Sequence, residues 1–281
     1  LLRIEKCFKI ICFSPSGDIV VAKSKNAVRL YSFPDLEMIK EIPMPKDAIG
    51  PAYLNHTEQA IFCGSKHGRL YLIEIKNHKI KNSWDIKKGT PITVEGYFKK
   101  DVLIIKVGPD SIMIYDTANS SVVSEIKLEH KPLKILGNLQ SIGIVCMDNK
   151  FLIWDTTNKC IKAKLSVLKA QGTISAYSSD NKFVLISPNK AILIIDPLTL
   201  NYFSVPLDEQ RAIASALILP NKTIAGFGQD AFYILDIHGD LLYRLPIDRC
   251  QGQTDSLLYK KGTGEIIAIK DSNIAIISPV K

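Results

Sequence analysis

One short pattern that recurs seven times constrains this chain more than any other feature. In each copy an apolar residue, any residue and two further apolar or aromatic residues precede a residue that is usually polar or acidic. The copies are Val28–Ser32, Leu70–Glu74, Ile112–Asp116, Phe151–Asp155, Ile192–Asp196, Phe232–Asp236 and Ile274–Ser278. Their last residues are 39 to 42 positions apart. Short apolar strands repeating at about 40–45 residues are typical of four-stranded propeller blades, whereas helical repeats need apolar residues at i, i+3, i+4 and i+7.

Each repeat divides into four short strands separated by turn residues. In the first repeat we expect strands at 8–13, 19–22, 27–33 and 37–42, with a Pro- and Gly-containing turn at 14–18. The strand pattern predicts seven units at about 7–43, 48–87, 91–128, 131–166, 171–206, 211–246 and 254–278. Hairpin follows hairpin, which leaves little room for helices.

The last unit is one strand short. Its first three strands are expected at 255–259, 265–269 and 273–277, and the chain ends soon after them. A strand within residues 1–6 precedes the first unit and completes the last one if the two pair. That pairing also removes sheet edges that would otherwise invite aggregation. The sequence therefore predicts an all-β single domain over 1–281, a seven-bladed β-propeller closed by the N-terminal strand.

The polar residues of the fourth repeat resemble those of the WD-repeat (WD40) family. Trp154 and Asp155 form the namesake dipeptide, and Asp148 stands six residues before Trp154, where the family has a turn Asp. His130 matches the family's buried His, and Cys146 stands where a Ser or Thr is expected on the second strand. We therefore assign structural roles to His130, Asp148, Trp154 and Asp155.

The resemblance covers the whole chain, although the other repeats depart further from the family pattern. Tyr115-Asp116, Ile195-Asp196 and Leu235-Asp236 look like degenerate forms of the dipeptide, but most Gly-His pairs are missing. The resemblance implies a scaffold that binds protein or peptide partners, usually within a multi-subunit complex, without a cofactor.

Composition places the chain among ordinary globular proteins. Hydrophobic residues make up 46% and charged residues 23% of the 281. No apolar run approaches the roughly 18 residues that a membrane-spanning helix needs. The six cysteines are scattered without metal or disulfide spacing, so we expect free thiols in a reducing, cytoplasmic or nuclear compartment. The absence of an initiating Met suggests a segment of a longer protein.

Catalytic and metal-binding patterns are missing from the sequence. The five histidines divide between two ends of the predicted sheets: His56, His78 and His238 at one end, His67 and His130 at the other. Asp116, Asp155, Asp196 and Asp236 occupy equivalent positions, where an acidic side chain commonly caps turn amides. We therefore expect no enzyme, no catalytic residue, no metal and no cofactor. A lactonase-like propeller enzyme is a third alternative, and it requires polar groups that converge on a channel.

A lysine-rich rim supports the second functional hypothesis. The chain carries a net charge of +8, and the predicted turns between second and third strands contain a lysine in six of the seven repeats. These partner-binding candidates are Lys23, Lys25, Lys66, Lys106, Lys150, Lys190 and Lys270. If they gather on one face, they favour an acidic or phosphorylated peptide, nucleic acid or anionic phospholipid. Lysines are also common elsewhere on the surface, so a solvated rim is the plainer interpretation.

Overall fold

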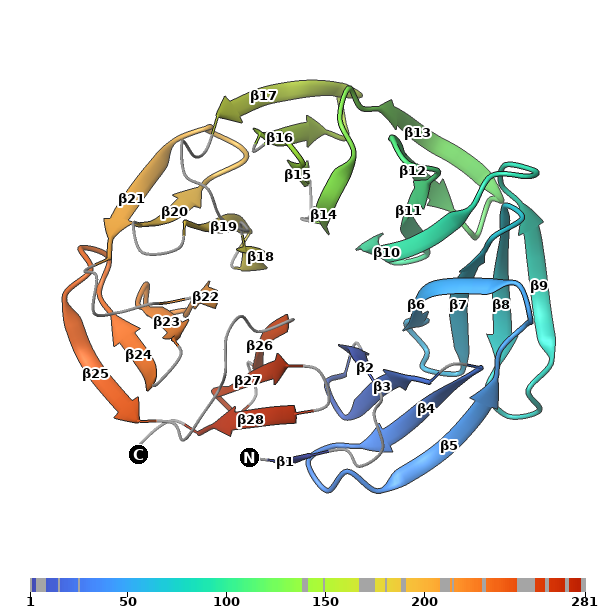
Figure 1. The fold of residues 1–281 in the computed structure, drawn as a ribbon, viewed down its shortest axis with the longest axis horizontal. Coiled ribbons are helices and arrows are strands. Elements are labelled where there is room, and N and C mark those ends of the chain that lie inside the picture. Colours follow the sequence, from blue (N-terminus) through green and yellow to red (C-terminus); the bar gives the residue numbers. More distant parts are fainter. Residues whose placement is uncertain are drawn as a thin grey trace. The chain divides into compact units, whose positions relative to one another are not determined.

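The computed structural model describes residues 2–3, 9–14, 16–24, 26–137, 141–148, 150–166, 175–179, 181–187, 191–207, 213, 215–228, 231–246, 256–260, 263–270 and 273–278. The protein is all-β, with 64% of residues in strands and no helix in the part that is described. Seven four-stranded antiparallel sheets give it a propeller-like organisation (Figure 1). No helix among the described residues is long and apolar enough to cross a membrane.

The chain divides into two compact units, 1–131 with 271–273, and 132–270 with 274–281. Three sheets belong to the first unit, each ordered as its strands follow in the chain. The first sheet contains β2 (Lys9–Phe13), β3 (Ile19–Lys23), β4 (Ala27–Ser32) and β5 (Met38–Pro43). The second contains β6 (Ala48–Leu54), β7 (Ala60–Ser65), β8 (Arg69–Glu74) and β9 (Ile80–Asp85). The third contains β10 (Ile92–Lys99), β11 (Val102–Val107), β12 (Ser111–Asp116) and β13 (Ser121–Lys127).

The next three sheets belong to the second unit and follow the same order. The fourth contains β14 (Pro132–Gly137), β15 (Ser141–Cys146), β16 (Lys150–Asp155) and β17 (Cys160–Ser166). The fifth contains β18 (Ser175–Ser179), β19 (Lys182–Ser187), β20 (Ala191–Ile195) and β21 (Tyr202–Pro206). The sixth contains β22 (Ser215–Ile218), β23 (Ile224–Phe227), β24 (Ala231–Leu235) and β25 (Leu241–Pro246).

The seventh sheet has the order β1-β28-β27-β26. Its strands are β1 (Leu2–Arg3), β26 (Ser256–Lys260), β27 (Glu265–Lys270) and β28 (Asn273–Ile277). The predicted strands of the first and last repeats are confirmed to within about one residue at the ends that are described. Turn residues such as Gly17 and Gly264, both with positive φ, end these strands where the sequence indicates.

A β-bulge accompanies the repeated sequence pattern. In five sheets the register between the third and outer strands shifts one residue before the polar residue that ends the pattern. The shifts lie at Leu30/Tyr31, Leu72/Ile73, Ile114/Tyr115, Ile153/Trp154 and Ile234/Leu235. In the fifth sheet β20 pairs with β21 without a shift. A bulge bends and twists a strand, so the repeat in sequence corresponds to a repeat in backbone geometry.

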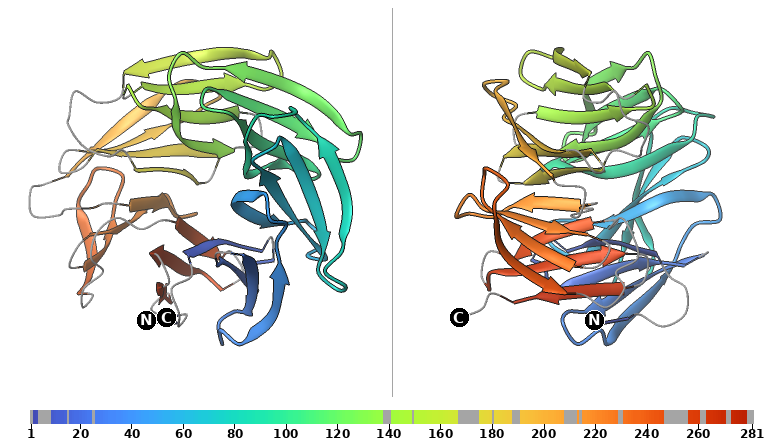
Figure 2. Two further views of the ribbon diagram at one scale, coloured as in Figure 1. Left: turned by 45° about the vertical axis from the view of Figure 1, so that its right-hand side comes forward. Right: turned by 60° about the vertical axis from the view of Figure 1, so that its left-hand side comes forward.

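The core lies between neighbouring sheets of the same unit. Second strands such as β7 and β15 are buried along their whole length. For β7 the reason is that the first and third sheets pack on its two faces. In the first unit one cluster joins the first and second sheets and another joins the second and third. In the second unit similar clusters join the fourth sheet to the fifth, the fifth to the sixth and the sixth to the seventh. Figure 2 shows the strands of these sheets in two further views. Outer strands are therefore left with side chains toward solvent.

Candidate functional site: an apolar outer belt

The predicted lysine rim is only partly a set of free charges. Of its members in the first unit, Lys66 is exposed in the β7–β8 turn, whereas Lys23 ends β3 and is half-buried. The prediction that Lys106 lies in a turn is wrong, because it lies within β11, one residue before that strand ends. A strand position between two packed faces leaves Lys106 half-buried. Lys25 and Lys190 lie outside the described residues, as does the side chain of Lys270.

Neighbouring groups engage the half-buried lysines. Lys23 Nζ donates a hydrogen bond to the carbonyl oxygen of Gly50, and burial lowers the pKa of this lysine. Burial raises the pKa of Glu95 on β10, while a 2.6 Å hydrogen bond from Thr93 Oγ1 and the charge of Lys106 act in the opposite direction. In the second unit Lys150 Nζ lies 2.6 Å from Asp148 Oδ2. Two of the described rim lysines, Lys106 and Lys150, therefore have a carboxylate nearby.

The structure gives different results for the residues to which the sequence assigns structural roles. Trp154 is buried on β16, and Asp148 Oδ1 accepts a long 3.4 Å hydrogen bond from the Lys150 amide, as suits a turn residue. The prediction that His130 is buried is wrong: it is exposed in the bend before β14, between exposed Glu129 and Lys131. Among the described residues the indole N–H of Trp154 has no hydrogen-bond partner.

The repeated aspartates cap turns, as predicted. Asp155 Oδ1 accepts hydrogen bonds from the amides of Thr157 (2.8 Å) and Asn158 (3.0 Å), and these bonds lower the pKa of Asp155. Asp116, Asp196 and Asp236 make equivalent contacts with amides two to four residues further on. The carboxylates therefore serve local backbone structure.

No described group of three or more His, Cys, Asp or Glu side chains is arranged to hold a metal ion. His56 and His78 lie in turns at one end of the second sheet, and His67 lies in the β7–β8 turn at the other end. Cys12, Cys63, Cys146 and Cys160 are free thiols, which confirms the prediction for these four cysteines.

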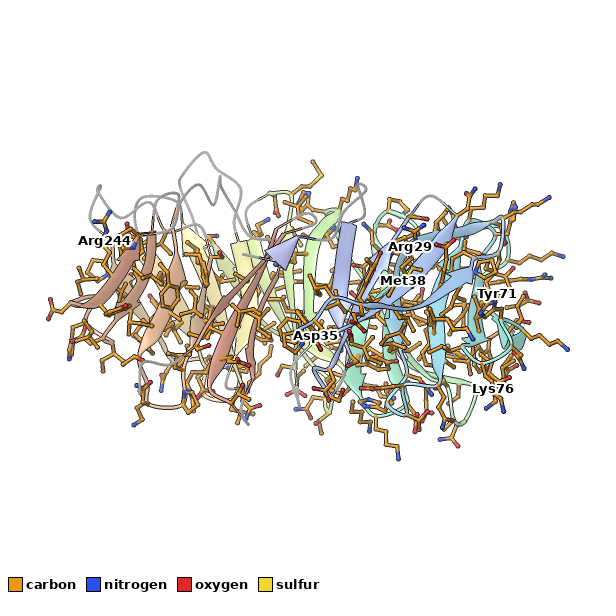
Figure 3. All side chains as sticks on the ribbon, turned by 90° about the horizontal axis from the view of Figure 1, so that it is seen from below. Arg29, Asp35, Met38, Tyr71, Lys76 and Arg244 are labelled. Carbon is orange, nitrogen blue, oxygen red and sulfur yellow. The ribbon has the colours of Figure 1, made fainter. Side chains whose placement is uncertain are left out.

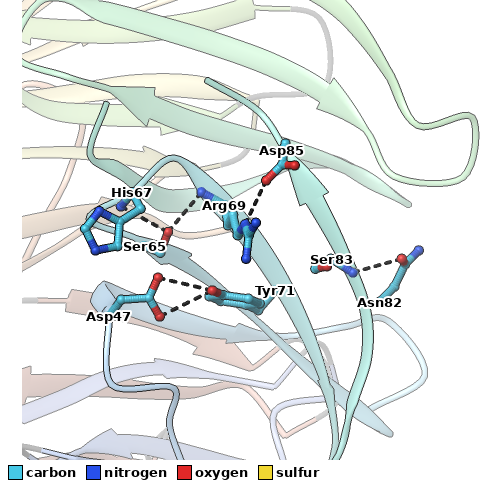
Figure 4. Close-up of polar contacts among 8 residues, drawn as sticks. All are labelled: Asp47, Ser65, His67, Arg69, Tyr71, Asn82, Ser83 and Asp85. Carbon is cyan, nitrogen blue, oxygen red and sulfur yellow. Dashed lines mark hydrogen bonds and ion pairs between the residues drawn. The ribbon is translucent and has the colours of Figure 1, made fainter. Parts of the chain in front are cut away.

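A pocket of about 480 Å³ opens at one end of the second sheet. Its lining residues are Asp47, His67, Arg69, Asp85, Lys88 and Gly89. Figure 4 shows the first four of them with their polar contacts. Tyr71 Oη donates to Asp47 at 3.1 and 3.3 Å, and Arg69 Nε donates to Asp85 Oδ1 at 2.8 Å across the β8–β9 ladder. Both carboxylates are thus engaged by neighbouring side chains, and opposite charges alternate around the pocket.

Backbone hydrogen bonds to Gly68 hold the loop that forms one wall of this pocket. The amides of Ile86 and Lys87 donate to the Gly68 carbonyl at 2.9 and 3.2 Å, and the Gly89 amide donates to the His67 carbonyl at 3.0 Å. A Cβ atom at Gly68 would lie 1.9 Å from the Lys87 oxygen, so only glycine permits this approach. Sequence reasoning missed the pocket because Asp47 and Tyr71 are 24 positions apart.

A departure from an ordinary polar surface lies on the outer strands of the fifth and sixth sheets and in the turns that lead into them. Of the 14 large hydrophobic residues that are exposed in the described part of the chain, eight lie between positions 198 and 245. They are Leu198, Tyr202, Phe203, Ile237, Leu241, Leu242, Tyr243 and Leu245, with 37 to 64% of each exposed. We call this set the apolar belt.

The outer strands of the first unit are different in composition. β5, β9 and β13 each contain at least two charged residues, such as Lys40 and Glu41 on β5. β21 contains none, and β25 contains only Arg244 (Figure 3). Charged side chains on an edge strand hinder unwanted pairing with other chains, so the belt lacks a protection that other outer strands of this chain possess.

The two parts of the belt meet within the second unit. β21 ends close to where β25 begins, on the outer side of their sheets (Figure 1). The turn that leads into β25 contacts the end of β21, because a Cβ atom at Gly239 would lie 2.9 Å from the Pro206 oxygen and 3.2 Å from Val205 Cγ1. Val205 and Tyr233 also share one core cluster. The belt therefore follows two successive outer strands.

Comparison with known proteins identifies no relative. No family model matches the chain, and no curated protein matches it at a significant level. The proposed function therefore depends on the belt, the pocket and the turn contacts.

Proposed function

We propose that this chain is a non-catalytic protein-binding scaffold that holds its partners through the apolar belt. The belt carries this proposal, because contiguous exposed apolar surface commonly marks protein interaction sites. Six large side chains lie on two successive outer strands that contain a single charged residue, Arg244, and Leu198 and Ile237 lie in the turns before those strands. Partners within a multi-subunit assembly would keep such a surface covered.

We further propose a WD-repeat-like, seven-bladed propeller in a single domain, closed by the N-terminal strand. Seven four-stranded sheets, the recurring bulge and the order β1-β28-β27-β26 support it. Rigid sheets suit a scaffold because surface side chains are then held in place without further ordering on binding.

Two alternatives have weaker support. The basic-face hypothesis relies on lysines of which Lys23, Lys106 and Lys150 interact with Gly50, Glu95 and Asp148. The enzyme hypothesis relies on converging polar groups, whereas the described aspartates cap their own turns and those at the pocket bind Tyr71 and Arg69. A stable fold explains all of these contacts.

Affinity purification with the full chain tests the scaffold function. The belt variant Tyr202→Lys/Leu242→Lys places charges at positions that are 64 and 56% exposed. The control variant Ile80→Lys/Val122→Lys places them on outer strands of the first unit at positions that are 52 and 51% exposed. We expect stoichiometric partners with the wild type and the control, and their loss with the belt variant. Equal recovery with both variants would contradict the proposal.

A further inference from the structure

We propose that β25 accepts an extended segment of a partner protein as a fifth strand of the sixth sheet. This inference rests on the proposed scaffold function and specifies how a partner is held. It commits to one occupant: an extended partner segment with apolar side chains and an acidic residue.

The backbone of β25 supplies the first argument. β25 is an edge strand of its sheet, and no described strand pairs with its outer side. Six residues present about 20 Å of backbone whose alternate N–H and C=O groups point outward. Only another extended chain satisfies such a row of donors and acceptors in register.

Side-chain exposure supplies the second argument. All six residues of β25 are exposed, a burial pattern shared with no other described outer strand. Beyond the bulge, Tyr243 and Leu245 project from one face of the strand and Arg244 from the other. Side chains of an added strand would lie directly beside them and cover the apolar surface of Tyr243 and Leu245.

Charge defines the chemistry of the occupant. Arg244 is the single charged residue of β25, and opposite charges in directly paired positions stabilise a sheet. The whole chain carries a net charge of +8. An acidic residue in the added strand complements this overall charge.

A second copy of this chain fits less well. Two copies bring like net charges together. A partner segment that carries an acidic residue avoids this repulsion.

A synthetic octapeptide tests strand addition directly. The probe alternates valine and threonine and carries one aspartate at a central position. We expect it to bind the full chain and to protect the amides of residues 241–245 from hydrogen exchange. A matched peptide with N-methyl groups on alternate residues keeps the side chains but loses half of the donors, and we expect its binding to be at least about tenfold weaker.

Variants of the chain locate the site. Leu242→Lys and Tyr243→Lys should each weaken peptide binding by about tenfold, because both place an unpaired charge beside the added strand. Ile80→Lys on β9 is the matched control and should bind normally, since this position is similarly exposed but belongs to another outer strand. Far-ultraviolet circular dichroism verifies that each variant is folded.

Four outcomes overturn the strand-addition proposal. They are absence of binding, equal binding of the N-methylated peptide, protection outside β25, and a dimer whose dissociation by Tyr243→Lys identifies a second copy as the occupant. If affinity purification still recovers partners that the belt variant loses, the scaffold function stands while strand addition fails. If the peptide does not bind and the belt variant recovers the same partners as the control, both proposals are contradicted.

Discussion

The indole N–H of Trp84 donates a 2.9 Å hydrogen bond to Ser120 Oγ. Trp84 lies on β9 of the second sheet, and Ser120 lies in the β12–β13 turn of the third, so this bond joins neighbouring sheets at their outer ends. Ser120→Ala removes the acceptor, and we expect a loss of about 1 kcal/mol of unfolding free energy. Urea unfolding measures it. Because Ser120 has a positive φ of 51°, Ser120→Gly should lose less than Ser120→Ala; the reverse order would contradict this account.

Gly68 and Gly89 provide a matched pair for the pocket wall. Both have positive φ, 87° and 78°, but an added Cβ meets the Lys87 oxygen only at Gly68. Gly89→Ala should cost about 1 kcal/mol through backbone strain alone. Gly68→Ala should cost about 3 kcal/mol or more, since the loop must also move. Thermal unfolding of the two variants compares them, and equal losses would show that close approach is unimportant.

The Asp155 turn should contribute stability that depends on pH. Its pKa is lowered from 3.8, so the contribution is present above that ordinary value and is lost as pH falls through the folded-state pKa. Asp155→Ala should therefore be less stable than the wild type at pH 7, with a deficit that shrinks below about pH 4. Asp155→Asn retains an oxygen acceptor and serves as control. A deficit that is the same at pH 7 and pH 3 would argue against the cap.

Thiol accessibility should separate the free cysteines. Burial raises the pKa of Cys63 to about 12, whereas Cys160 is exposed at the start of β17. At pH 8 we expect an aromatic disulfide reagent to modify Cys160 rapidly and Cys63 only after unfolding, because the thiolate is the reactive form. Mass spectrometry of the modified peptides identifies the sites. Rapid modification of Cys63 in the folded protein would be inconsistent with its place in the core.

The sequence predicts the strands well because the repeat is a property of local pattern. Alternating or continuous apolar runs, Gly- and Pro-containing turns and the aspartates that cap turns in four of the repeats all act within a few residues. The bulge follows the same positions, as at Ile153/Trp154 and Ile114/Tyr115. Seven sheets were therefore predictable from one chain.

Contacts between sheets are less predictable. The partner of Lys23 is a carbonyl 27 residues away on the second sheet, and sequence spacing does not reveal it. The resemblance to WD-repeat proteins predicts a buried His130. This residue lies in the bend before β14 and is exposed. Resemblance to a motif therefore predicts a position in the chain better than its burial.

The apolar belt was missed for a related reason. The segment Leu241–Pro246 has the composition of a core strand, and only its position as the fourth strand makes it an edge. A comparison of outer strands among the repeats carries the signal: β25 has one charged residue, whereas β9 has Lys81 and Asp85. Composition becomes informative once each strand is assigned its place in the sheet.

Cooperative unfolding tests the proposal that the two compact units form a single closed propeller domain. The two tryptophans of the chain, Trp84 and Trp154, lie in different compact units. The variant Trp84→Phe keeps the reporter of the second unit, and Trp154→Phe keeps that of the first. Urea unfolding followed by fluorescence gives a midpoint and a slope for each variant. These values are compared with the circular dichroism transition of the same variant. We predict that each reporter coincides with its own circular dichroism transition, as in a single two-state ring. Reporters that depart from those transitions in opposite directions would show two independent domains and contradict the account.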